Sequence, residues 1–224
     1  MKTPLIPEWL VWARDLQALA QSGLAYAESP FDRERYESIM KIAADMMATG
    51  SNAEMARVLD LFAGQDGYAT PKAVVRAAVF DAQGRILLVR EVLDQHRWTL
   101  PGGWADVNLT PVENTVKEVR EESGFDVRVT RLAAVWDRDR QGHPPGPFSC
   151  YTLCFMCELT GGTATTSVET SEIGWFAEDA IPTDLSLGRV LPQQIARLFA
   201  HRRNAGLPTE FDSRRAAQYP NDKE

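Results

Sequence analysis

Three glutamates in one short acidic segment have the spacing that most clearly suggests chemistry. They are Glu118, Glu121 and Glu122, and they lie in residues 111–123, for which the sequence predicts a helix. At 100° per residue, Glu118 and Glu122 lie about 40° apart, and Glu121 lies about 60° to the other side of Glu118. All three carboxylates are therefore predicted to share one helix face.

Such a face suggests a cation site, because like charges at this spacing destabilise an isolated helix. Carboxylates are hard ligands that suit Mg²⁺ or Mn²⁺, which bind through a few carboxylates together with waters and substrate phosphates. The alternative is a solvated acidic face, supported by ion pairs of Lys117 with Glu113 and with Glu121. The helix alone leaves both interpretations open.

The boundaries of this helix are well marked. Thr110 and Glu113 form a predicted capping box around Pro111, and Gly124 can end the helix. The Pro-Gly-Gly segment at 101–103 allows the backbone to approach a ligand closely and places a carbonyl near the acidic helix.

Together these residues resemble the Nudix box, G-x(5)-E-x(7)-R-E-U-x-E-E-x-G-U, where U is a bulky aliphatic or aromatic residue. In register with it are Gly103, Glu118, Val119, Glu121, Glu122, Gly124 and Phe125, and the preceding Trp98-x-Leu-Pro-Gly-Gly is typical of the family. Two positions differ: Leu109 stands in place of the early Glu, and Lys117 in place of the Arg.

With these two departures, the box resembles the pattern of a Nudix subgroup that has an N-terminal helical domain. This subgroup includes CDP-choline and ADP-ribose pyrophosphatases. Lys117 lacks the planar fork with which an Arg orders carboxylates. Glu113 is expected to pair with Lys117 and to be structural rather than a metal ligand. The resemblance covers roughly residues 5–200.

This resemblance implies a diphosphohydrolase that uses Mg²⁺, with Mn²⁺ as a second possibility. It implies that Glu118 and Glu122 are the principal metal ligands. Glu121 would be a further ligand or the water activator, and the Gly103 carbonyl a backbone ligand. Metal ions bridging a diphosphate neutralise charge on the leaving phosphate and acidify the attacking water. We expect cleavage of a nucleoside diphosphate derivative, such as CDP-choline or ADP-ribose, to a nucleoside monophosphate and a phosphate ester.

Residues outside the box could complete the site, although each also has a simple structural interpretation. Nudix enzymes often take another acid from a loop, and Glu169 and Glu172 are the candidates, unless both are merely exposed acids beside a strand. An arginine suits phosphate, a tryptophan can stack on a base or fill a core, and a loop histidine can contact substrate or solvent. The candidates for substrate binding are Arg76, Arg90, Trp104, Trp136 and His143.

Two other functions remain open from the sequence. A Nudix-fold sensor could bind a nucleotide without hydrolysis and signal through the helical domain, although all three helix glutamates are present. The same box could also hydrolyse nucleoside triphosphates.

Charge and composition limit the classes of partner that the chain is expected to bind. The chain of 224 residues carries a formal net charge of −7, which opposes binding to nucleic acids or anionic lipids. It shows no signal peptide and no long apolar run, so we expect a cytoplasmic protein. The cysteines Cys150, Cys154 and Cys157 are interpreted as small buried residues, with Cys157 facing opposite to the other two.

Helical periodicity predicts an N-terminal helical domain, residues 1–66, with three helices and an N-cap at Asp32. This segment holds six basic and ten acidic residues, which argues against DNA binding and favours dimerisation or substrate capping. Because short helical units seldom supply enough core alone, we expect a homodimer, although packing onto the chain's own hydrolase domain would serve equally well.

The remainder predicts an α+β fold, a Nudix α/β/α sandwich with a mixed sheet, over residues 67–203. Residues 204–224 are expected to form a loosely ordered tail. The predicted strands are 74–80, 85–90, 127–136, 149–159 and 172–176, with a turn at 81–84 and a last helix at 187–202.

Overall fold

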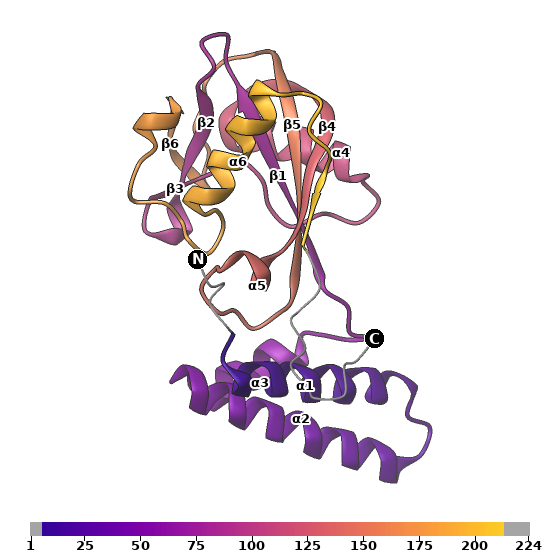
Figure 1. The fold of residues 1–224 in the computed structure, drawn as a ribbon. Helices are drawn as coiled ribbons and strands as arrows, with labels where there is room; N and C mark the ends of the chain where they lie inside the picture. Colours follow the sequence, from indigo (N-terminus) through magenta and orange to yellow (C-terminus); the bar gives the residue numbers. More distant parts are fainter. Residues whose placement is uncertain (1–5, 213–224) are drawn as a thin grey trace. The chain divides into compact units, whose positions relative to one another are not determined.

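A computed structural model describes residues 6–212, which divide into two compact units (Figure 1). The first contains the chain up to Lys72 together with Pro144–Cys150. The second contains Ala73–His143 and the chain from Tyr151 onward. Each unit is considered by itself. No helix among residues 6–212 combines the length and apolarity that a bilayer crossing requires.

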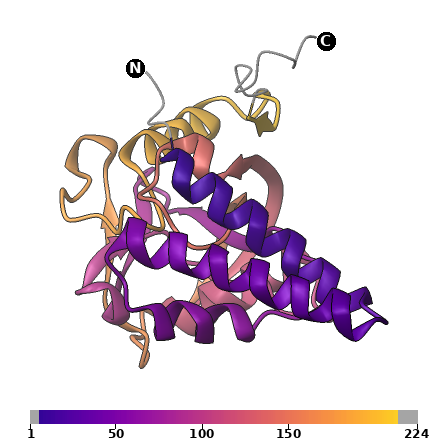
Figure 2. The ribbon, with the colours of Figure 1, turned by 90° about the horizontal axis from the view of Figure 1, so that it is seen from below.

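The first unit contains the three predicted helices: α1 (Glu8–Tyr26), α2 (Pro30–Ser51) and α3 (Met55–Ala63). Figure 2 shows α1 and α2 lying side by side, with extensive contacts between them. Small residues let these helices approach closely, and the core consists of Leu10, Ala13, Ala43, Ala44, Met47, Ala48, Val58 and Phe62.

The start of α2 differs from the prediction. Ser29, not Asp32, is the N-cap, and its hydroxyl accepts the Phe31 N–H. Pro30 takes the first helical position, where its missing N–H costs nothing. Asp32 lies within the first turn and pairs with Arg35 at 2.6 Å.

The second unit is built on a seven-stranded sheet, within the described residues, in the order β3-β2-β1-β5-β4-β7, with β6 paired to β2. The strand pairs among the described residues are antiparallel except β4–β7, which is parallel, so the sheet is mixed as predicted. The strands are β1 (Lys72–Phe80), β2 (Ile86–Glu91), β3 (Arg97–Thr99), β4 (Phe125–Asp137), β5 (Cys150–Gly162), β6 (Thr170–Phe176) and β7 (Glu210–Phe211).

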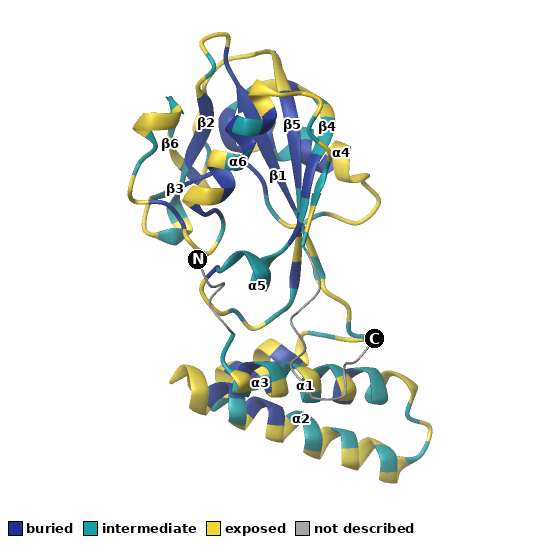
Figure 3. Ribbon diagram, in the orientation of Figure 1, coloured by how far each residue is buried: buried dark blue, intermediate teal, exposed yellow. Residues whose placement is uncertain are grey.

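Helices cover both faces of this sheet, which confirms the sandwich. Leu87 packs in one core with Val119 of α4 (Pro111–Ser123), whereas its neighbour Leu88 packs in the other core with Leu198 of α6 (Pro192–Arg203). This alternation is the period-2 pattern of a strand buried on both sides. Figure 3 shows the buried strands between helices whose outer surfaces are exposed.

Smaller elements complete the unit: η1 (Val92–Asp94), α5 (Arg138–Gln141) and η2 (Glu178–Ala180). The three cysteines are free and buried, and Cys154 and Cys157 belong to different cores, which confirms their predicted opposite orientation.

The prediction of a loosely ordered tail was wrong for residues 210–211. Residues 210–211 form β7, because the outer edge of β4 offers unpaired backbone groups that a short parallel strand can satisfy. The Asp212 carboxylate also accepts the Asp137 N–H at 2.5 Å. Residues 213–224 lie outside the described residues.

Candidate active site

The box helix α4 begins and ends as predicted. The Thr110 hydroxyl accepts the Glu113 N–H at 3.2 Å, while the Glu113 carboxylate accepts the Thr110 N–H at 2.8 Å. Gly124 ends the helix with a φ of 72°, a left-handed conformation that favours glycine. These bonds lower the pKa of Glu113. The predicted Glu113–Lys117 ion pair does not form within the described residues, because the carboxylate is turned back to the helix start.

Glu122 is the most deeply buried acid of the box, with 4% of its surface exposed. Its Oε2 accepts the backbone N–H of Gly102 at 2.8 Å. Burial raises the pKa of Glu122 from 4.5 to about 8, although Arg76 and the Gly102 N–H partly oppose that rise. Because the effect of burial exceeds that of Arg76, the Glu122 carboxylate favours a further cation as a counter-charge.

The glycines at 102 and 103 bring backbone against both inner glutamates. Gly102 has a φ of +138°, and a Cβ there would lie 2.1 Å from the Val75 carbonyl oxygen. A Cβ on Gly103 would lie 3.0 Å from the Glu118 Oε2. Glu118 is itself partly buried, and this burial raises its pKa. Glu118 and Glu122 therefore converge on the same piece of backbone.

Glu121 is oriented differently from the other two. Its exposed carboxylate lies 2.9 Å from the Lys117 Nζ, which also contacts Asp106 at 3.1 Å and Glu118 at 4.0 Å. These carboxylates raise the pKa of Lys117. Residues 6–212 contain no group of three or more His, Cys, Asp or Glu residues already arranged to hold a metal. The sequence placed three glutamates on one face, and the structure brings two of them together.

The two candidate acids outside the box lie in different surroundings. Glu169 is exposed just before β6, and its charge contributes to raising the pKa of Glu118, so it lies near the box. Glu172 lies within β6 and pairs with Arg90 at 3.5 Å. Thr170, between them, donates its hydroxyl to the Glu122 carbonyl at 2.6 Å. This bond joins the start of β6 to the box helix.

The candidate arginines are already engaged. Arg76 is buried and donates to the carbonyl oxygens of Leu100, at 3.1 Å, and of Gly102. Its burial lowers its pKa, and Glu122 is the largest opposing influence. Arg90 hydrogen-bonds Asp184 at 2.7 Å and lies over the Trp98 ring. Arg76 is therefore a buried support of the glycine segment and not the surface side chain that was the alternative to a phosphate contact.

The two tryptophan candidates differ in their exposure to solvent. Trp136 is 2% exposed within the core that faces α6, so its ring is not free to stack on a base. Trp104 is 57% exposed and keeps that possibility. His143 is buried, not solvated as a loop histidine would be, and its Nδ1 lies 2.7 Å from the Leu187 carbonyl oxygen. Burial lowers the pKa of His143.

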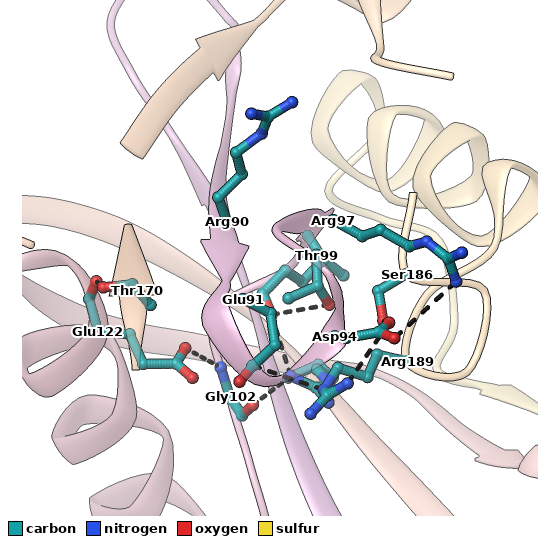
Figure 4. Close-up of polar contacts among 12 residues, drawn as sticks. Arg90, Glu91, Asp94, Arg97, Thr99, Gly102, Glu122, Thr170, Ser186 and Arg189 are labelled. Carbon is teal, nitrogen blue, oxygen red and sulfur yellow. Dashed lines mark hydrogen bonds and ion pairs between the residues drawn. The ribbon is translucent and has the colours of Figure 1, made fainter. Parts of the chain in front are cut away.

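Two charged residues near the box were missed from the sequence, Glu91 and Arg189. Glu91 is 6% exposed at the end of β2, and the Arg189 guanidinium lies 3.5 Å from its carboxylate (Figure 4). An acid that ends a buried strand is a signal that sequence reading could have used. Arg189, in an irregular segment far along the chain, has no such signal.

Comparison with known proteins matches residues 70–196 to the NUDIX domain and residues 7–62 to a UDP-X-like, N-terminal oligomerisation domain. The chain is 44% identical over 205 residues to YjhB of Bacillus subtilis (strain 168), which is named as a candidate ADP-ribose pyrophosphatase. That match covers 92% of this chain and 97% of YjhB.

Two similar proteins with solved structures are also a diphosphatase and a pyrophosphatase. A UDP-X diphosphatase structure superposes with a TM-score of 0.59 at 31% identity, covering 95% of this chain and all of that one. An ADP-ribose pyrophosphatase from Streptococcus suis gives a TM-score of 0.58 at 37% identity, over 64% of this chain and all of that one. With its box helix, its mixed sheet and these relatives, the chain belongs to the Nudix family and is a diphosphohydrolase.

Proposed function

We propose that this diphosphohydrolase uses a divalent cation to split the pyrophosphate bond of a nucleoside diphosphate joined to a second moiety. The observation that carries the proposal is the convergence of Glu118 and Glu122 on the Gly102–Gly103 backbone, where burial raises both pKa values. The names of the relatives, for ADP-ribose and UDP-X compounds, support this class of substrate, to which CDP-choline also belongs.

The residues present fit a hard divalent cation. Two partly desolvated carboxylates lack a full counter-charge, and the missing Cβ of Gly103 leaves backbone directly beside Glu118. Glu118, Glu122 and the Gly103 carbonyl would hold the ion, and Glu121 would join them on leaving Lys117. Such an ion, Mg²⁺ or in its place Mn²⁺, supplies Lewis acidity and lowers the pKa of bound water.

The remaining residues position this site. Arg76 holds the carbonyls of Leu100 and Gly102, which keeps the Gly102 N–H directed at Glu122. Glu169 is the better candidate for accepting a proton from the attacking water. It lies near enough to influence Glu118, whereas Glu172 is paired with Arg90.

The proposal is tested by incubating the purified protein with ADP-ribose, a UDP-sugar, CDP-choline and ATP, each with Mg²⁺, Mn²⁺ or EDTA. We expect a nucleoside monophosphate and a phosphate ester from at least one of the first three, and no product with EDTA. Release of pyrophosphate from ATP alone would favour triphosphate hydrolysis instead. Thermal stabilisation by a nucleotide without product in any mixture would contradict hydrolysis and favour a sensor.

We further propose that the predicted helical domain, residues 1–66, forms a homodimer. Trp12, Leu19 and Tyr26 are exposed at seven-residue spacing along α1, so they form one apolar stripe. The match of residues 7–62 to an oligomerisation domain supports this assignment. Sedimentation should give a dimer for the native chain and a monomer for Leu19→Glu, with exposed Ser38→Glu as the control. A native monomer at micromolar concentration would contradict the proposal.

A further inference from the structure

Arg189 lies in the turn that precedes α6, and backbone bonds fasten this turn to β3. The Ser186 N–H donates to the Trp98 carbonyl at 2.8 Å, and the Trp98 N–H donates to the Asp184 carbonyl at 3.1 Å. The Arg189 N–H closes the turn onto the Ser186 carbonyl at 2.8 Å. The backbone of Arg189 is therefore held in place.

The side chain of Arg189 is held much less firmly. Its guanidinium lies 3.5 Å from Glu91 and 3.6 Å from Asp94, distances longer than those of charge-assisted hydrogen bonds. Within residues 6–212 its side chain makes no hydrogen bond that meets the usual geometry, and 32% of it is exposed. Its donors are thus available to a better acceptor.

Other basic side chains around the box are held by shorter contacts, although the Nε atoms of Arg76 and Arg90 have no hydrogen-bond partner among the described residues. Arg76 is buried with two carbonyl acceptors, and Lys117 lies between two carboxylates at 2.9 and 3.1 Å. Arg90 hydrogen-bonds Asp184 at 2.7 Å. Because the chain carries a net charge of −7, an anionic substrate benefits from a local cation, and the long contacts of Arg189 leave it available for this role.

The strand pairing of Glu91 links Arg189 to the box. Its partner Glu91 pairs across the sheet with Thr170, whose hydroxyl donates to the Glu122 carbonyl at 2.6 Å. Figure 4 shows the Glu122–Gly102 contact and the contacts of Arg189 with Glu91 and Asp94 in the same region. The charges of Glu122, Arg189 and Glu118 all act on Arg76, which places Arg189 within electrostatic range of the site.

Asp94 does not depend on Arg189. The Ser186 hydroxyl donates to Asp94 at 2.5 Å, and Arg97 lies 3.9 Å from it. If the guanidinium turned toward a ligand, Asp94 would keep both of these partners. Rotation of Arg189 would therefore leave Asp94 paired, while Glu91 would keep the electrostatic influence of Arg76.

We propose that Arg189 binds a phosphate of the substrate diphosphate through its planar fork and thereby sets the affinity for substrate. The inference rests on the proposed function and adds a residue to it. A guanidinium can donate two parallel hydrogen bonds to phosphate oxygens, which a Lys cannot reproduce. On binding the phosphate, Arg189 would exchange its long ion-pair contacts with Glu91 and Asp94 for charge-assisted hydrogen bonds.

The test compares steady-state kinetics of the full-length native protein, Arg189→Ala, Arg189→Lys and the control Arg97→Ala, with saturating Mg²⁺ and the panel's best substrate. Arg97 lies 3.9 Å from the same Asp94 and makes no ion pair with Glu91 within the described residues, so it controls for loss of a nearby positive charge. We expect KM to rise about 10- to 100-fold in Arg189→Ala with kcat changed less than about threefold. Arg189→Lys should show a smaller rise in KM, and Arg97→Ala should match the native protein.

Arg189→Lys also keeps a charge beside buried Glu91, so it remains informative if Arg189→Ala folds poorly. A native KM in Arg189→Lys would overturn recognition by the planar fork. A loss confined to kcat, or equal effects in the Arg189 and Arg97 variants, would overturn the proposal. Absence of turnover in the native protein would instead refute the proposed function.

Discussion

Replacing Glu122 by Gln should lower kcat at least about 10³-fold, equivalent to about 4 kcal/mol of transition-state stabilisation, while the fold stays intact. Gln keeps an oxygen that can accept the Gly102 N–H at this buried position. It removes the charge that would hold a divalent cation beside Glu118. Initial rates at several Mg²⁺ concentrations, together with circular dichroism, measure both parts of this expectation.

The matched control is Glu158→Gln. Glu158 is an exposed acid of β5 that pairs with Arg128 on the neighbouring strand, outside the box. It should retain native kcat and KM, since surface pairs of this kind contribute little. Native turnover in Glu122→Gln would remove the main support for the assigned metal ligands.

The stability of the metal-free protein should fall as pH rises from about 5 to about 8.5. The folded-state pKa of Glu122 is raised from 4.5 to about 8, so in this window the folded chain binds a proton that the unfolded chain has lost. The free energy of unfolding is highest below the unfolded pKa and falls through the folded pKa. Since each unit corresponds to about 1.4 kcal/mol, the decrease from Glu122 is at most about 5 kcal/mol.

Urea unfolding in EDTA at pH 5 and pH 8.5 measures this dependence. Glu122→Gln cannot ionise, so it should unfold at a similar urea concentration to the native protein at pH 5 and at a higher one at pH 8.5. Glu118 contributes in the same direction and remains in both proteins, so some decrease should persist. Parallel pH profiles for the two proteins would show that Glu122 does not carry the effect.

Features encoded by local sequence were predicted well. The box helix has its Thr110 cap and Gly124 end where the sequence placed them, because capping depends on residues within one turn. The alternation of Leu87 and Leu88 between two cores likewise follows from strand geometry alone. The start of α2 was missed because Ser29 and Asp32 both suit a cap, and Pro30 decides between them.

Features that depend on distant parts of the chain were predicted less well. Helical angles placed Glu121 with the other glutamates, but its carboxylate pairs with Lys117. Lys117 is itself held by Asp106, which lies outside the helix. Trp136 was a base-stacking candidate from the sequence, but in the fold it is buried in the core that contains residues of α6. Arg189 could not be found at all, since its proximity to the box depends on how the turn before α6 is fastened to β3.

The segment Pro144–Cys150 belongs to the helical unit although both of its flanks belong to the sheet unit. Within the helical unit, Arg14 donates to the carbonyls of Gly146 and Phe148, and the Lys72 N–H donates to the Ser149 carbonyl. The chain therefore crosses between the units at three places, after residues 72, 143 and 150. A protease that cut after residue 72 would leave the helices associated with residues 144–150 through noncovalent contacts alone. A chimera that exchanged only the N-terminal helices with a relative would separate Arg14 from its acceptors. An exchange that preserves the helical unit has to transfer residues 144–150 as well.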